Sequence, residues 1–303
     1  MGGNVDQATA LRVLVKKEIA MQKKVAMKQR DEKNRAIRVI AITSGKGGVG
    51  KTNIAANLAY ALAVMNRKVL VMDADMGLAN IDLVFGLTPK YNLYHLLKGE
   101  KSLKDVIVRG PGGIAVLPAA SGIAEMAELS RGHKLALLDE LNALEERPDF
   151  MLVDTAAGIA GNVTYFNQAA KEIFVITTPE PASMTDAYAL MKILFQTYAR
   201  KRFRLIINMV KNHGEAMEVF QRLRHAMDHF LSLQIELLGY VLYDEKFKEV
   251  IKRQKALTEL YPLSPASKCL YGIAEKVCGE TPESVESGRL VFFGETGIHH
   301  DHG

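Results

Sequence analysis

The segment SGKGGVGKT, Ser44 to Thr52, has the residue types and the spacing of a phosphate-binding loop. It matches the pattern GxxxxGK[ST], follows an apolar β-branched run and opens a helical pattern, which is the context that such a loop requires. Backbone amides of glycine-rich turns, together with a helix N-terminus, attract phosphate oxygens. We therefore expect the nucleotide-binding residues to be Gly45, Lys46, Gly47, Gly48, Val49, Gly50, Lys51, Thr52 and Asn53.

Two side chains at the end of this loop carry the expected chemistry. In loops of this pattern the lysine, here Lys51, contacts the β- and γ-phosphates, and the hydroxyl of the next residue, here Thr52, binds Mg²⁺. A glycine-rich turn that binds no nucleotide is the alternative. The complete motif in its strand–loop–helix context argues against it.

Carboxylates follow two further apolar runs. Asp73 and Asp75 lie in MDADMGLANID, and Asp154 lies in LVDTAAG. Ligands of α/β proteins bind beyond the carboxyl ends of the strands, so we expect these side chains beside the phosphate loop. Capping of the next helix is an equally common use of one aspartate at such a position. The three motifs in this order nevertheless predict a site for a Mg²⁺-bound nucleotide.

The elements that must position these residues alternate between β-branched runs and helical patterns from Arg38 onward. This alternation predicts an α/β fold, a doubly wound and mostly parallel sheet of about seven or eight strands with helices on both faces. We expect strands at Val39–Thr43, Val69–Asp73, Ile114–Leu117, Met151–Asp154, Ile173–Thr177, Arg204–Asn208 and Leu237–Val241. We expect helices at Thr52–Met65, Lys134–Glu146, Ala182–Tyr198, Ala216–Leu231 and Pro265–Cys278.

Length and charge suggest one large domain with two terminal segments. The 303 residues are 48% hydrophobic, which is enough for one full α/β core. Residues 1–38 hold ten Lys or Arg against four Asp or Glu, so the N-terminus is more basic than the net charge of +5 would suggest. We expect a basic helical arm at 1–35, a nucleotide-binding domain at 36–282 and a tail at 283–303. Such an arm suits an acidic partner, although a plain solvated helix is an open alternative.

Several classes of protein are disfavoured by what the sequence lacks. No run approaches the roughly 18 consecutive apolar residues of a membrane-spanning helix, and the N-terminus has no signal-peptide core, so we expect a cytoplasmic protein. Cys269 and Cys278 are too few for a disulfide framework and are not spaced for an Fe–S cluster.

The phosphate loop resembles the deviant loop of the MinD/ParA class of P-loop ATPases, because it carries a second lysine, Lys46. In that class this lysine reaches across an ATP-bound homodimer to the partner's phosphates. The resemblance implies that Lys46 and Lys51 are catalytic, that Asp75 orients the attacking water, and that Asp75, Thr52 and Asp154 form the Mg²⁺ site. Lys46 would then act in trans as an arginine finger does, and such a residue raises the rate of hydrolysis by about 10³ to 10⁵.

The same resemblance implies ATP as the nucleotide. Asn208, in IINMV, matches the asparagine that contacts adenine, and Asp244, in LGYVLYDEKF, matches the segment that covers the base. Leu242 departs from the pattern, since the class usually has proline there, and this puts the details of the base pocket in doubt. Glu180, in TTPEPASMTDAY, falls at a helix start that lies near the dimer and partner surface in MinD.

The two ends of the chain resemble the FlhG family, also called FleN, of flagellar-number regulators. DQATALR matches the DQAxxLR element of that family, an activator helix that stimulates the SRP-type GTPase FlhF, with Gln7 in the catalytic role. The implied partner-binding residues are Asp6, Gln7, Ala8, Leu11 and Arg12, and the implied membrane-targeting residues are Leu290, Val291, Phe292 and Phe293. Nearby glycines make a poor helix there, so a strand packed onto the domain is the alternative.

Together these resemblances imply a switch that hydrolyses ATP and regulates flagellar number and placement. It would form a homodimer with ATP and Mg²⁺, attach peripherally to the cytoplasmic face of the inner membrane, and act through FlhF and flagellar assembly or transcription partners. A division-site regulator of the plain MinD type and a DNA-partition ATPase of the ParA type are the alternatives. Nucleic acid is not an expected partner.

Overall fold

The computed structural model describes residues 37–280 and residue 292, apart from residues 78, 79, 121, 122, 124, 125 and 127. These residues belong to one compact unit of the chain. Most of the expected domain at 36–282 is therefore described. The expected arm, with Asp6, Gln7, Ala8, Leu11 and Arg12, lies outside the described residues.

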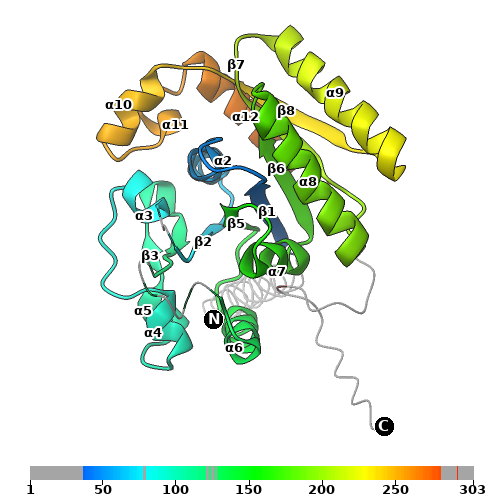
Figure 1. Ribbon diagram of the computed structural model, residues 1–303. Helices are drawn as coiled ribbons and strands as arrows, with labels where there is room; N and C mark the ends of the chain where they lie inside the picture. Colours follow the sequence, from blue (N-terminus) through cyan, green and yellow to red (C-terminus); the bar gives the residue numbers. More distant parts are fainter. Residues whose placement is uncertain are drawn as a thin grey trace, which may run out of the picture. The chain divides into compact units, whose positions relative to one another are not determined.

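An eight-stranded sheet forms the centre of the fold, with the order β3-β4-β2-β5-β1-β6-β7-β8 (Figure 1). Its strands are β1 (Arg38–Ser44), β2 (Val69–Ala74), β3 (Val108–Arg109), β4 (Ala115–Leu117), β5 (Phe150–Ala157), β6 (Glu172–Thr177), β7 (Arg204–Val210) and β8 (Glu236–Leu242). All pairings are parallel except the one between β3 and β4. The predicted doubly wound, mostly parallel sheet is confirmed.

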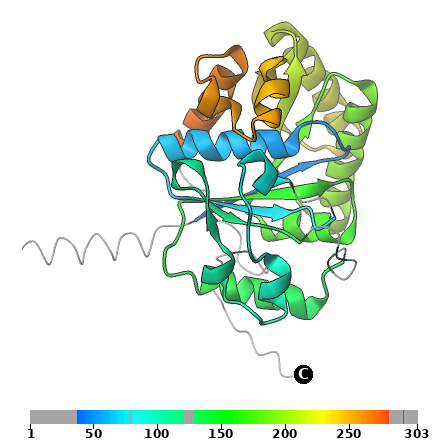
Figure 2. The ribbon, with the colours of Figure 1, turned by 90° about the vertical axis from the view of Figure 1, so that its left-hand side faces the viewer.

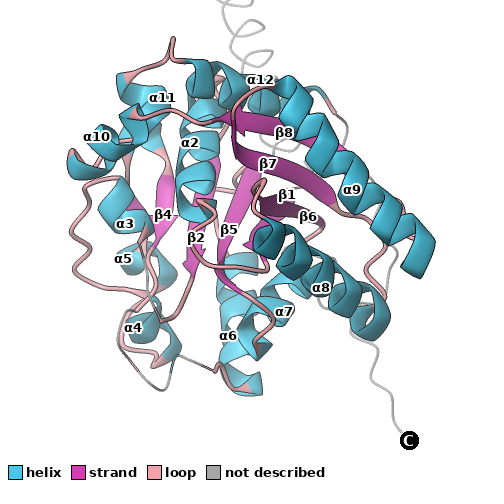
Figure 3. Cartoon of the chain, turned by 45° about the horizontal axis from the view of Figure 1, so that its top comes forward, coloured by secondary structure: helices cyan, strands magenta, loops and turns pink. Residues whose placement is uncertain are grey.

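Helices cover both faces of this sheet, as Figure 3 shows. They are α2 (Lys51–Val64), α3 (Ile81–Val84), α4 (Leu93–Leu97), α5 (Leu103–Val106), α6 (Arg131–Asn142), α7 (Gly161–Ala169), α8 (Pro181–Tyr198), α9 (His213–Leu231), α10 (Lys246–Lys252), α11 (Leu257–Leu260) and α12 (Pro265–Gly279). The five expected helices correspond to α2, α6, α8, α9 and α12. None of the helices in the described part of the chain is long and apolar enough to cross a bilayer.

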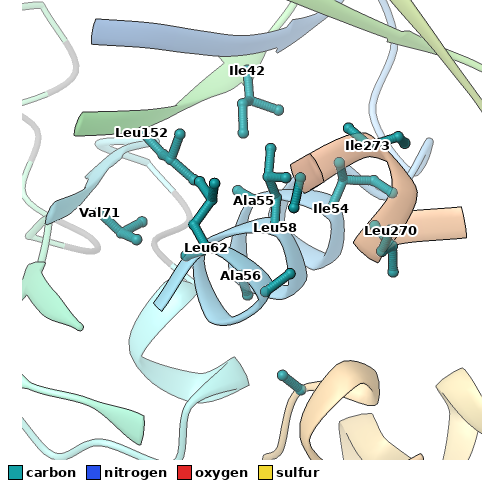
Figure 4. Packing of buried hydrophobic residues seen from close by; sticks show 14 of the residues in the cluster. Ile42, Ile54, Ala55, Ala56, Leu58, Leu62, Val71, Leu152, Leu270 and Ile273 are labelled. Atoms are coloured by element: carbon teal, nitrogen blue, oxygen red, sulfur yellow. The ribbon is translucent and has the colours of Figure 1, made fainter. Parts of the chain in front are cut away.

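The core is divided by the sheet, because successive strand residues point to opposite faces. Ile40 and Ile42 of β1 belong to a buried cluster with α2 and α12, whereas Val39 and Ala41 pack with α6 and α7. A further cluster lies beneath α8 and α9. Figure 4 shows Ile42 beside Ala55 and Leu58 of α2, and Figure 2 shows α2 running along the sheet.

This topology determines where a functional site can form. The parallel strands β1, β2, β5, β7 and β8 all end at the same edge of the sheet. The residues that follow these strands, including the phosphate loop after β1, are therefore brought together from distant parts of the sequence.

Candidate nucleotide-binding site

The phosphate loop connects β1 directly to α2. Gly48 and Gly50 have φ angles of 80° and 89°, in the left-handed region that glycine adopts without strain. A Cβ atom at Gly47 or Gly48 would meet nothing within 4 Å, so this side of the loop is open. No side chain caps the N-terminus of α2, and its first turn has no acidic residue. The free amides there are suited to bind an anion.

Lys51 and Thr52 occupy the first turn of α2, beside the carboxylate of Asp154. Lys51 is buried, with 8% of its surface exposed. The Thr52 hydroxyl and the Lys51 ammonium both lie near the Asp154 carboxylate and favour its ionised form, which partly offsets the effect of burial on its pKa. The predicted association of these three residues is therefore seen in the structure.

Asp154 is a suitable ligand for a divalent cation. Burial raises the pKa of this carboxyl group above its ordinary value, because the charged form is poorly solvated. Its Oδ1 atom is buried and has no hydrogen-bond partner in the described part of the chain. A carboxylate oxygen left in this state fits Mg²⁺, which prefers oxygen ligands. Thr52 and Asp75 are the other residues that could hold such an ion, directly or through water.

Asp73 positions the loop that carries Asp75, a role that the sequence did not reveal. Its Oδ1 accepts the backbone N–H of Asp75 at 3.0 Å, and its Oδ2 accepts those of Asn80 at 2.9 Å and Ile81 at 3.1 Å. Asp73 pairs in register with Asp154 across β2 and β5. Burial, and then the charge of Asp154, raise the pKa of Asp73.

Lys46 interacts with Glu180, the residue that precedes α8. Its Nζ atom is 2.8 Å from Oε2 of Glu180 in the same chain, and the two side chains are 39% and 67% exposed. The hydrogen bond and the charge of Glu180 raise the pKa of Lys46. A Cβ atom on Gly45 would lie 2.1 Å from the backbone oxygen of Asp186, so the loop and α8 are in close backbone contact.

The two residues that the resemblance assigns to the adenine side, Asn208 and Asp244, lie near the end of β7 and just after β8. The Asn208 amide donates to the backbone oxygen of Val49 at 2.8 Å and is buried against the loop. Oδ1 of Asp244 accepts the Lys246 N–H at 3.0 Å, whereas its Oδ2 is buried with no partner among the described atoms. The structure thus brings Asn208 and Asp244, both named from the sequence, to the expected edge of the sheet.

Of the four residues expected to target a membrane, the structure describes Phe292. Its side chain is fully buried and stacks on Phe166, with ring centroids 6.3 Å apart. Its N–H donates to the backbone oxygen of Ala169 at 3.1 Å, at the end of α7. The Phe292 side chain therefore packs onto the domain, beside the rings of Tyr165 and Phe166. Leu290, Val291 and Phe293 lie outside the described residues.

Comparisons with known proteins agree with this geometry. Residues 40–257 match the family model described as the CobQ/CobB/MinD/ParA nucleotide binding domain. The antiactivator FleN of Pseudomonas aeruginosa is 40% identical, over 87% of this chain and 94% of that protein. The flagellum site-determining protein YlxH of Helicobacter pylori is 36% identical, over 84% of each.

Solved structures point to the same family. The cell division ATPase MinD of Pyrococcus furiosus has a TM-score of 0.67 and 26% identity, over 80% of this chain and 99% of that one. MinD of Pyrococcus horikoshii, solved as a complex with Mg-ADP, also has a TM-score of 0.67 and 26% identity, over 80% and 96%. The chain is therefore a P-loop ATPase that belongs to the MinD/ParA nucleotide-binding family and, within it, to the FlhG/FleN family that includes YlxH.

Proposed function

We propose that this protein is a Mg²⁺-dependent switch that dimerises on ATP and is reset by hydrolysis. The observation that carries the proposal is the different placement of its two loop lysines. Lys51 is buried at the start of α2, where it serves its own chain's site. Lys46 is partly exposed and is held by Glu180, so it is available to a second copy of the chain.

The residues of the site have separate roles in this proposal. Lys51 and the free amides of α2 hold the phosphates, while Thr52 and Asp154 hold the metal. A Mg²⁺ ion held there would supply positive charge that offsets the charge of the phosphates. Asp75, kept in place by Asp73, orients the attacking water. On dimerisation, Lys46 would leave its ion pair with Glu180 and contact the phosphates bound to the partner subunit.

The biological output proposed for this ATPase is control of flagellar number and placement, supported by the similarity to FleN and YlxH. The arm at 1–35 would stimulate FlhF through the DQATALR element, and the domain at 36–282 would contact flagellar assembly or transcription partners. The tail at 283–303 would give the cytoplasmic protein reversible contact with the inner membrane. Because the Phe292 side chain is buried against α7, it would first have to leave the domain.

The switch can be tested by size-exclusion chromatography with light scattering. Asp75→Ala should slow hydrolysis and therefore accumulate a dimer with ATP and Mg²⁺, but remain a monomer with ADP. In that background Lys46→Ala should still bind ADP but fail to dimerise, whereas Lys51→Ala should lose nucleotide binding itself. A monomer under all conditions would contradict the switch while leaving the nucleotide site intact.

The flagellar assignment needs a separate test, because a division-site regulator would use the same ATPase. We expect the full chain to stimulate GTP hydrolysis by FlhF and Gln7→Ala to abolish this effect without changing ATP binding. An absence of stimulation would favour a plain MinD-type role. ATP-dependent retention on DNA that weakens steeply with salt would favour the ParA-type alternative.

A further inference from the structure

Asn57, a residue of α2 outside the phosphate loop, makes a buried polar link to a distant part of the chain. Its side chain is fully buried. Its Oδ1 atom accepts the backbone N–H of Thr258 at 2.8 Å and the Thr258 hydroxyl at 3.0 Å. Its Nδ2 atom donates to the backbone oxygen of Asn53 at 2.7 Å, which fixes the orientation of the amide.

This link holds one end of the base-side segment, by which we mean residues 243–258. The segment begins at Tyr243, whose N–H donates to the backbone oxygen of Val210 at 2.8 Å, just beyond Asn208. It contains Asp244 and α10, and it ends at Thr258 on α11. One end is therefore attached to β7 and the other to the helix that starts with Lys51.

We infer that Asn57 is a positioning residue for adenine recognition, because it sets the register of the base-side segment against α2. This inference rests on the proposed binding of adenine nucleotides. Val250, Ala256 and Leu257 also pack the segment onto the core, but apolar packing has no direction and tolerates sliding. Hydrogen bonds to Thr258 are directional and allow one register.

Loss of the Asn57 amide would leave the Thr258 N–H buried without a partner. Such a group is costly in the interior, so the segment would shift until this N–H reached water or another acceptor. The shift would move Asp244 relative to Asn208, and adenine binding would weaken. The phosphate loop should keep its conformation, because the Asn57 side chain is hydrogen-bonded to Asn53 and Thr258 rather than to residues 44–52, and its bond to Asn53 lies within the helix.

The experiment compares two probes on the full chain by isothermal titration calorimetry with Mg²⁺, namely ADP and inorganic pyrophosphate. Pyrophosphate needs the loop alone, whereas ADP also needs the base side. For Asn57→Ala we expect the dissociation constant for ADP to rise by about tenfold, on the scale of one unpaired buried group. The dissociation constant for pyrophosphate should stay within about twofold, so the ratio of the two should change.

Two matched variants make the result specific. Thr258→Val keeps the backbone N–H bond to Asn57 and removes the hydroxyl, so ADP should weaken by a smaller factor, about threefold. Asn92→Ala removes another asparagine that makes local backbone contacts, the cap of α4, and should leave both dissociation constants unchanged. If Asn57→Ala does not fold, the ratio of the dissociation constants for ADP and pyrophosphate in Thr258→Val tests the inference instead.

The outcomes separate this inference from the proposal on which it rests. A wild-type chain that binds neither probe would refute the proposed nucleotide function. A wild-type chain that binds both, with variants that weaken both probes equally or neither, would overturn the role of Asn57. A selective loss of ADP affinity, graded from Asn57→Ala to Thr258→Val, would establish it.

Discussion

At the scale of single residues, the site brings together two carboxyl groups that repel one another. Asp73 and Asp154 are neighbours across β2 and β5, and both are buried. Burial raises the pKa of both groups, so each stays protonated to a higher pH than an ordinary aspartic acid when no cation is present. Functional sites often contain such destabilising arrangements, which ligand binding offsets.

The first prediction concerns Asp154→Asn in the nucleotide-free and Mg²⁺-free protein. A carboxyl group with a pKa raised in the folded state contributes stability below its unfolded pKa, and this contribution is lost as pH rises through the folded pKa. For Asp154 the folded pKa is about 6. The neutral amide avoids this loss, so the free energy of unfolding should exceed that of wild type at pH 8, by on the order of 1–3 kcal/mol.

Thermal unfolding at about pH 5 and at about pH 8 would check this expectation, because Asp154 is mostly protonated at the lower pH and resembles asparagine there. The same variant should lose Mg²⁺-dependent ATP hydrolysis, which shows that the gain in stability comes at the functional site. A variant that is less stable than wild type at pH 8 would contradict this account of Asp154.

The residues of the phosphate loop could be named from the sequence because their partners are close along the chain. Lys51 and Thr52 follow one another, and the motif itself defines their geometry. The contacts of Asn57 with Thr258 and of Lys46 with Glu180 span 201 and 134 residues. No local sequence pattern contains such pairs, so the role of Asn57 could be inferred only from the fold. The sequence indicated a place for Glu180 near the partner surface only through the family resemblance.

At the scale of elements, the phosphate loop and the start of α8 behave as one packed unit. Gly45 lies so close to Asp186 that a Cβ atom would be 2.1 Å from the backbone oxygen and 2.8 Å from the next backbone nitrogen, that of Ala187. Glu180, which holds Lys46, precedes the same helix. A displacement of the loop would therefore also displace the start of α8.

The second prediction compares Gly45→Ala with Gly47→Ala. A methyl group at Gly45 would collide with backbone atoms that cannot rotate away, so the loop and α8 must separate. We expect a loss of about 1–3 kcal/mol in the free energy of unfolding, the range for overpacked sites. At Gly47 a Cβ atom meets nothing within 4 Å, and the change should stay within about 0.5 kcal/mol.

Urea unfolding of the nucleotide-free variants measures this difference without interference from bound phosphate. Equal destabilisation by the two substitutions would mean that the backbone of Gly45 has room to relax. In that case the coupling between the loop and α8 would be weaker than the structure indicates.

The sequence predicted long elements better than short ones. Helices α2, α8, α9 and α12 have clear periodicity, whereas α3, α5 and α11 span four residues each and owe their order to packing rather than to local preference. The predicted helix at Lys134–Glu146 begins earlier, at Arg131, because the Ser130 hydroxyl accepts the N–H of His133 and caps it. The antiparallel strand β3 has two residues, too few for any pattern.

At the scale of the whole molecule, α12 and Phe292 pack on opposite faces of the sheet. Glu280 follows α12, which packs with α2 on one face, and is held by Arg204 at 2.7 Å. Phe292 packs with α7 on the opposite face. The apolar residues Leu290–Phe293 suit both a membrane and a buried site on the protein, so the sequence alone does not distinguish the two.

The third prediction tests Phe292→Ala against Phe230→Ala. Phe292 is fully buried, so its truncation should lower the free energy of unfolding by about 3–5 kcal/mol, as for other buried aromatic side chains. Phe230 is 69% exposed on α9 and loses the same atoms, yet its truncation should cost less than about 1 kcal/mol. Denaturant unfolding of the nucleotide-free protein gives both values.

Sedimentation with anionic vesicles distinguishes a packed Phe292 from a membrane anchor. If Phe292 is packed against Tyr165 and Phe166, Phe292→Ala removes that packing, so stability should fall while vesicle binding without ATP is maintained or increased. If Phe292 serves instead as an exposed anchor, the variant should unfold like wild type and bind vesicles less. The second result would contradict the packing of Phe292 against Phe166 and support the role of Phe292 as a membrane anchor.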